Sequence, residues 1–276
     1  MDITVSFGEL ALLAGSLMAA GVVAGLLAGL FGIGGGGIIV PVMVEVLDAL
    51  HFDPAIQVHV GVGTALAVVV PTSIRSTLAH LKSGKVDTGL LRSWIVPVPL
   101  GVAAAALVAA FVSGDVLRLI FAGIASTIGI RLLLNLDKLR LGPDIPGEPL
   151  RAVSGALIGF VSALMGIGGG VINNTYMTLF NRPIHQAVAT SAGVGVLIAI
   201  PGAIGYAVAG WSVEGLPPFS VGYVNLLAVA LVIPITILLA PIGARMAHRW
   251  SKRKLQIGFG LFLLAISTRL VLAMLG

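Results

Sequence analysis

Two glycine runs are the residues whose type and spacing point most clearly to chemistry. Gly32-Ile33-Gly34-Gly35-Gly36-Gly37 ends in four consecutive glycines, and Gly166-Ile167-Gly168-Gly169-Gly170 ends in three. Each glycine costs about 1 kcal/mol relative to alanine inside a helix, so a helix should break at both runs. A short helix that starts after such a break offers free backbone N–H groups and a positive dipole end, which bind anions.

We therefore expect both runs to line a substrate site. The residues in question are Gly34, Gly35, Gly36, Gly37, Gly168, Gly169 and Gly170. Close packing between helices is the alternative reason for glycine in an apolar chain, and it explains Gly25-xxx-Gly29 and Gly155-xxx-Gly159 better. Neither run ends in the Gly-Lys-Ser/Thr of a phosphate loop, so a nucleotide site is not indicated.

Polar side chains near the second run could complete such a site. Asn173, Asn174 and Thr175 follow it directly, whereas the first run is followed by Ile38, Ile39 and Val40, so the two halves are not equivalent. Three hydroxyls on long apolar segments are further candidates for binding substrate: Thr64, Thr190 and Ser191. Bonding to the carbonyls of their own helices is an equally good explanation for these hydroxyls.

Few charged residues fall inside apolar segments. Arg75 could face a cavity and a substrate, or it could extend to the membrane surface. We expect that extension for Arg118, Arg131 and Arg269, which lie nearer segment ends.

Glu45 and Asp48 are the acids placed inside the membrane, and either could carry a coupling proton or pair with an arginine. Glu45 and His80 are the candidates for coupling, although His80 could also mark the interface. The histidines and acids lack the spacing of metal ligands, so we predict no metal, no cofactor and no enzyme activity.

The composition identifies the solvent that must surround these residues. The chain has 276 residues, of which 58% are hydrophobic and 10% are charged, with a mean hydropathy of +1.09. A soluble domain carries roughly 25% charged residues. The sequence therefore predicts an all-α polytopic membrane protein. Cysteine is absent, which excludes thiol chemistry.

Ten apolar pieces separated by short connections are expected to be helical. They are residues 9–31, 38–50, 56–81, 90–112, 115–134, 151–165, 172–180, 186–209, 220–241 and 254–275. Three of them, 38–50, 151–165 and 172–180, are short for a bilayer about 30 Å thick.

The basic residues set the expected orientation. Twelve of the sixteen Lys and Arg residues fall in four alternate connections. By the positive-inside rule these connections are cytoplasmic, which places a multi-pass protein in the cytoplasmic (inner) membrane with both termini outside the cytoplasm. This distribution also explains the net charge of +5 without a nucleic-acid partner.

The chain also repeats itself. Residues 21–36 match residues 155–170 without a gap, and Thr64 aligns with Thr190. This divides the chain into a first repeat over 1–134, a cytoplasmic linker over 135–150 and a second repeat over 151–276. Because each repeat has five crossings, the second enters the membrane inverted, which is typical of secondary transporters.

These motifs resemble a known family. The two G-I-G-G-G runs, the run from Thr64 to Asp87 and the A-T-S-A-G-V run from Ala189 to Val194 are similar to those of the sulfite exporter TauE/SafE family of membrane transporters. The resemblance implies a permease for sulfur-containing oxyanions such as sulfite, thiosulfate or an organosulfonate. It also implies that the glycine runs, Thr64, Thr190 and Ser191 belong to the site.

We expect a secondary transporter for a small sulfur oxyanion. It would work by alternating access, and proton coupling is an option. An anion channel, or a carrier for a cation or a neutral solute, is the alternative, because unwound carbonyls can coordinate cations. A membrane enzyme fits least well. The expected partners are a small anion and the lipid bilayer, and the sequence leaves a homodimer open.

Overall fold

The computed structural model describes residues 7–31, 36–134, 140–247 and 252–274, and helices dominate these residues. Their bounds are α1 Phe7–Phe31, α2 Gly36–Ala49, α3 Pro54–Lys82, α4 Thr88–Ser93, α5 Pro97–Phe111, α6 Gly114–Leu134, α7 Leu150–Leu164, α8 Gly170–Leu179, α9 Ile184–Ala209, α10 Leu226–Ala247 and α11 Lys252–Leu272. The prediction of a mostly helical chain is confirmed. Among the described residues, three helices, α3, α6 and α9, are long and apolar enough to cross a membrane by length and composition.

Two of the predicted segments differ in the structure. Residues 90–112 divide into α4 and α5, because Pro97 occupies the first turn of α5 and proline restricts the residue before it. The segment expected at 220–241 begins as a two-stranded hairpin, with β1 (Ser220–Val221) pairing antiparallel to β2 (Val224–Asn225). Helix α10 starts only after Asn225, whose side chain caps it by accepting from the N–H of Ala228.

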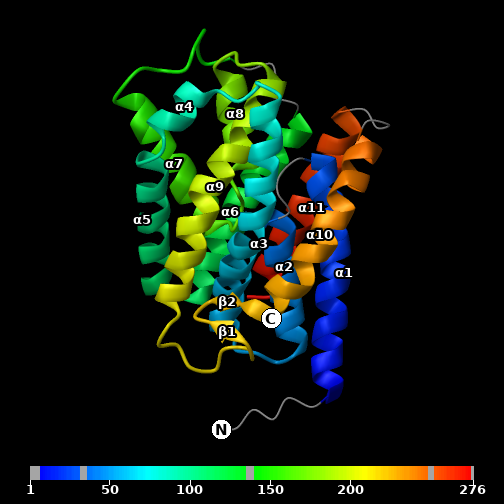
Figure 1. The fold of residues 1–276 in the computed structure, drawn as a ribbon. Helices are drawn as coiled ribbons and strands as arrows, with labels where there is room; N and C mark the ends of the chain where they lie inside the picture. Colours follow the sequence, from blue (N-terminus) through cyan, green and yellow to red (C-terminus); the bar gives the residue numbers. More distant parts are fainter. Residues whose placement is uncertain (1–6, 32–35, 135–139, 248–251, 275–276) are drawn as a thin grey trace.

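The helices pair across the two halves of the chain. Helix α1 packs along α10, while α5 packs along α7; α3 packs against α9, and α6 against α11. Figure 1 shows the hairpin and the start of α1 at the lower end of the molecule, and α4 at the upper end. We call these the hairpin end and the α4 end; the sequence predicts that the hairpin end faces outward.

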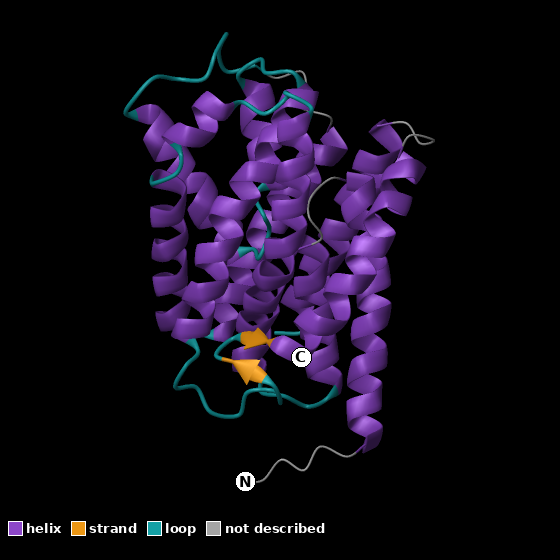
Figure 2. Cartoon of the chain, in the orientation of Figure 1, coloured by secondary structure: helices purple, strands orange, loops and turns teal. Residues whose placement is uncertain are grey.

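The second glycine run interrupts the chain inside the helical body. Helix α7 ends at Leu164 and α8 starts at Gly170, and the connecting loop lies among the helices near mid-height (Figure 2). Gly166 and Gly169 have φ values of 64° and 73°, in the left-handed region that favours glycine. The predicted break is therefore present. In the first run, Gly34 and Gly35 lie outside the described residues, and α2 begins at Gly36.

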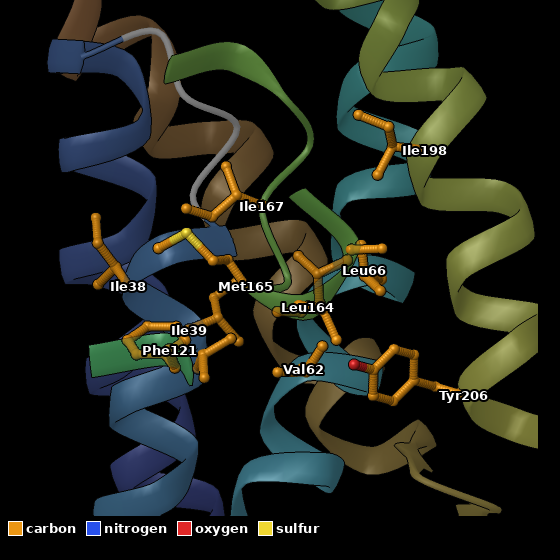
Figure 3. Packing of buried hydrophobic residues seen from close by; sticks show 14 of the residues in the cluster. Ile38, Ile39, Val62, Leu66, Phe121, Leu164, Met165, Ile167, Ile198 and Tyr206 are labelled. Carbon is orange, nitrogen blue, oxygen red and sulfur yellow. The ribbon is translucent and has the colours of Figure 1, made fainter. Parts of the chain in front are cut away.

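Buried apolar side chains surround the break. Met165 and Ile167 from the loop pack among α2, α3 and α9, together with Ile38, Val62 and Ile198 (Figure 3). The Tyr206 hydroxyl points from α9 towards Val62 and is buried with no hydrogen-bond partner. The break is thus enclosed by protein, as irregular backbone within a membrane requires.

Candidate functional site

The first turn of α2 and the loop after α7 meet directly. A Cβ placed on Gly36 would lie 2.1 Å from the carbonyl oxygen of Gly166, which is far inside van der Waals contact. A Cβ placed on Gly37 would lie 3.2 Å from Cδ1 of Ile167, which is closer than ordinary van der Waals contact. The described parts of the two glycine runs, far apart in sequence, therefore come together, and at Gly36 the close approach of the backbones explains the glycine.

The remaining glycines of the second run lie between α3 and α9. A Cβ on Gly168 would be 2.6 Å from Cγ1 of Val69, and a Cβ on Gly169 would be 2.6 Å from Cδ1 of Ile198. Helices α3 and α9 therefore both pack tightly against this loop. A movement of α3 against α9 would change the space around the start of α8.

Helix α8 begins without a side-chain cap. Its N-cap is Gly169, which has no side chain to accept a hydrogen bond from the first N–H groups. Such uncapped groups, with the positive end of the helix dipole, favour an anion. Gly170 is buried within the molecule, so these donors lie away from bulk water.

A polar cluster adjoins this helix start, and we call Ser162, Asn173, Asn174 and Ser191 the central cluster. Nδ2 of Asn173 donates to Oγ of Ser191 at 2.6 Å, and that hydroxyl donates to Oδ1 of Asn174 at 2.7 Å. Oδ1 of Asn173 and Oγ of Ser162 are buried without a hydrogen-bond partner. A Cβ on Gly169 would lie 3.8 Å from the Ser162 hydroxyl, which places that hydroxyl at the start of α8.

The central cluster can present a donor as well as an acceptor. If both amides turn over, Nδ2 of Asn174 donates to Ser191 and the Ser191 hydroxyl donates to Oδ1 of Asn173. The free position on Asn173 is then an N–H group, because an amide exchanges its acceptor and donor by this rotation. Together with the Ser162 hydroxyl, this gives two side-chain donors beside the start of α8.

Thr175 is separated from this cluster, although it follows Asn174 in sequence. Its hydroxyl accepts a hydrogen bond from Arg131 of α6. Successive residues of a helix point in directions about 100° apart, so the three polar residues of α8 cannot all face α9. Arg131 therefore contacts α8, whereas the sequence suggested that it extends to the membrane surface.

Thr64 and Thr190 hold chain segments together at opposite ends of the molecule. Each is 0% exposed. The Thr64 hydroxyl accepts from the backbone N–H of Asn225 at 3.0 Å, and the Thr190 hydroxyl accepts from the N–H of Asp87 at 2.9 Å. Asp87 and Asn225 are themselves N-caps, of α4 and α10. These threonines therefore bond to helix caps of the other half of the chain.

The charged candidates lie away from the central cluster. Arg75 is exposed on α3, and His80 is half-buried in the last turn of the same helix. Glu45 forms an ion pair with Arg269 of α11, whose side chain is 70% exposed. Pairing with an arginine was one of the two roles that the sequence suggested for Glu45, and in the structure Arg269 is that partner.

Sequence reasoning missed several buried polar residues near the hairpin end. Arg118 is only 5% exposed and donates to Oε1 of Gln57 at 3.1 Å, so the expectation that it extends to the membrane surface is wrong. Gln57 and His59 are also buried. Their position near the end of an apolar segment gave no signal that their side chains are buried.

Within the described ranges, no three His, Asp or Glu side chains come together as metal ligands do. The fold and this site define an integral membrane protein with a broken helix and a buried polar cluster. This arrangement is found in membrane transporters.

The comparisons name the family. The family model described as Sulfite exporter TauE/SafE matches residues 17–270, and this chain belongs to that family. A probable membrane transporter protein of Haemophilus influenzae is 30% identical over 91% of this chain and 96% of its own length. One of Methanocaldococcus jannaschii is 31% identical, covering 90% and 92%. No solved structure gives a significant match.

Proposed function

We propose that this protein is a secondary transporter that moves a small sulfur-containing oxyanion, such as sulfite, thiosulfate or an organosulfonate, across the cytoplasmic membrane by alternating access. The anion binds at the uncapped start of α8, beside the central cluster. Family membership and the curated relatives support membrane transport. The choice of a sulfur oxyanion draws on the family description and on the chemistry of this site.

The observation that carries the proposal is the pair of unpartnered buried polar groups at the start of α8. Leaving a buried polar group without a partner costs about 1–3 kcal/mol, so a protein retains one where a ligand supplies the missing bond. Ser162 Oγ and the free amide position of Asn173 are such groups. An oxyanion accepts hydrogen bonds, so it complements the Ser162 hydroxyl, the N–H groups of α8 and, once the amides have turned over, the N–H group of Asn173.

Alternating access further requires two halves that can exchange conformations. The cross-pairing of α1 with α10 and of α7 with α5 is what an inverted repeat over 1–134 and 151–276 produces. The matched hydrogen bonds of Thr64 with the cap of α10, and of Thr190 with the cap of α4, follow the same relation. Arg75, Glu45 and His80 stay as candidates for attracting the anion and for coupling its movement to protons.

Two substitutions and one control test this site. Ser162→Ala and Asn173→Leu each remove a proposed donor. We expect each substitution to raise the KM for sulfite uptake into proteoliposomes at least about tenfold, because hydrogen bonds to charged groups contribute roughly 1.5–3 kcal/mol. Thr127→Val is the control, because that hydroxyl is exposed and bonds to its own helix at Gly123. Unchanged KM values in both variants would exclude this site.

A further inference from the structure

His59 is a buried titratable side chain that the proposed anion site does not use. It lies on α3, one turn after Ala55, and is 2% exposed. Nδ1 lies 3.1 Å from the carbonyl oxygen of Ala55, and Nε2 lies 2.9 Å from the carbonyl oxygen of Ala109 on α5. Both neighbours are carbonyl oxygens, which only accept hydrogen bonds. A neutral imidazole carries one N–H, so only the doubly protonated ring donates to both.

Two further contacts favour a positive charge on this ring. Ala109 lies in the last turn of α5, where carbonyls lack partners within the helix and the dipole is negative, a position that stabilises a protonated histidine. The ring also stacks on Tyr223 of the hairpin, with centroids 4.8 Å apart and planes inclined by 29°. An aromatic face attracts a cation at such a distance.

Three charged groups at this end of the molecule have partners of their own. Asp53 caps α3, and on α6 Arg118 bonds to Gln57 and lies 3.9 Å from Asp115. Tyr223 is the titratable group that contacts the His59 ring. A second proton on the His59 ring lets it donate to both backbone carbonyls beneath an aromatic face, and its loss leaves one of the two, on α3 or at the end of α5, without a donor.

A second histidine occupies the same place in the other half. His59 precedes Thr64 by five residues, and His185 precedes Thr190 by five. The two threonines hold matching helix caps at opposite ends of the molecule. His185, at the start of α9, is exposed, whereas His59 is buried. In one conformation of an inverted repeat, equivalent residues of the two halves are expected to differ in this way.

We infer that His59 is a proton-binding site that holds the hairpin end closed, and that His185 takes the same role when the α4 end closes. This inference rests on the proposed alternating access. Proton binding at His59 joins α3, α5 and the hairpin; proton release leaves one carbonyl without a donor and allows that end to open. Protons would thus be bound and released in step with opening, which is what coupled transport needs.

The chain contains no cysteine, so a single introduced thiol reports on the opening of one end. Ala109→Cys places a thiol at a buried position of α5 and keeps the backbone carbonyl that His59 contacts. Maleimide reacts with the thiolate, whose fraction itself falls with pH, so labelling is expressed relative to that of the same variant in denaturant at the same pH. We expect this relative labelling by a membrane-impermeant maleimide to fall several-fold between about pH 8 and about pH 5.5. With His59→Gln added, the relative labelling should no longer depend on pH.

His51→Asn is the control, since that histidine is exposed, has no part in the inferred closure, and has a φ of 59° that asparagine tolerates. A response that persists in His59→Gln, or that disappears in His51→Asn, would overturn the assignment. A second measurement needs no substitution at His59: nitrogen NMR at about pH 5.5 should show one histidine with two N–H protons that exchange slowly with solvent. Rapid exchange at all five histidines would contradict the inference.

Neither measurement requires a substrate. Absence of sulfite uptake would therefore count against the proposed function and leave the labelling result standing. Labelling that is independent of pH, in a protein that does transport sulfite, would instead remove His59 as the proton site.

Discussion

Replacing Thr64 or Thr190 by valine should shift the protein towards opening at opposite ends. Valine has nearly the shape of threonine and lacks the hydroxyl, so Thr64→Val leaves the buried N–H of Asn225 without an acceptor, and Thr190→Val does the same to Asp87. A buried group left unpaired in this way costs about 1–3 kcal/mol. Both bonds are present in this structure, so each is kept until its own end opens fully. If the bond is lost at that point, the equilibrium shifts by up to about 5- to 150-fold towards the open arrangement.

Single thiols at the two ends measure this shift. Val58→Cys reports on the hairpin end and Leu90→Cys on the α4 end, and both positions are buried. We expect Thr64→Val to raise the labelling rate at position 58 and to lower or preserve it at position 90, and we expect Thr190→Val to do the reverse. Equal increases at both positions in each variant would indicate general loosening and would refute the idea of two alternating closures.

Three other predictions concern packing and charge. Gly36→Ala should prevent stable folding, because the added Cβ cannot fit beside the Gly166 carbonyl. Gly258→Ala is the control and should leave Tm unchanged, because a Cβ there meets nothing within 4 Å. Thermal unfolding in detergent measures both effects. Trp94→Phe should lower Tm by the same assay, since it leaves the Arg151 carbonyl without its 2.8 Å bond from the indole. Glu45→Gln should change Tm little, because exposed ion pairs contribute about 0–1 kcal/mol, and a large loss of Tm would show that its pair with Arg269 is structural.

Much of the helical organisation could be predicted from apolar segments and glycine runs, because both follow from local composition. The break before Gly170 and the short helices α2 and α8 are where the glycines place them. The division of 90–112 and the hairpin before α10 were not predicted. Hydropathy is continuous through both regions, and the structure there depends on Pro97 and on the cap at Asn225.

The candidate site could be predicted only in part. Asn173, Asn174 and Ser191 come together as polar residues beside a helix start, whereas Thr175 turns to Arg131. Residue type indicated that these groups need hydrogen-bond partners. Which partner each one finds depends on the rotation of α8 and on contacts with other helices, between residues 17 to 44 positions apart. Ser162 and His59 gave no signal for the same reason, since their surroundings come from other helices.

Uptake of labelled sulfite into proteoliposomes that contain the purified protein tests the central claim most directly. We predict saturable uptake that excess thiosulfate or an organosulfonate inhibits and that chloride does not, and that Asn173→Leu weakens. Absence of saturable uptake by protein shown to be folded, or flux that rises without saturation, would contradict a carrier for sulfur oxyanions.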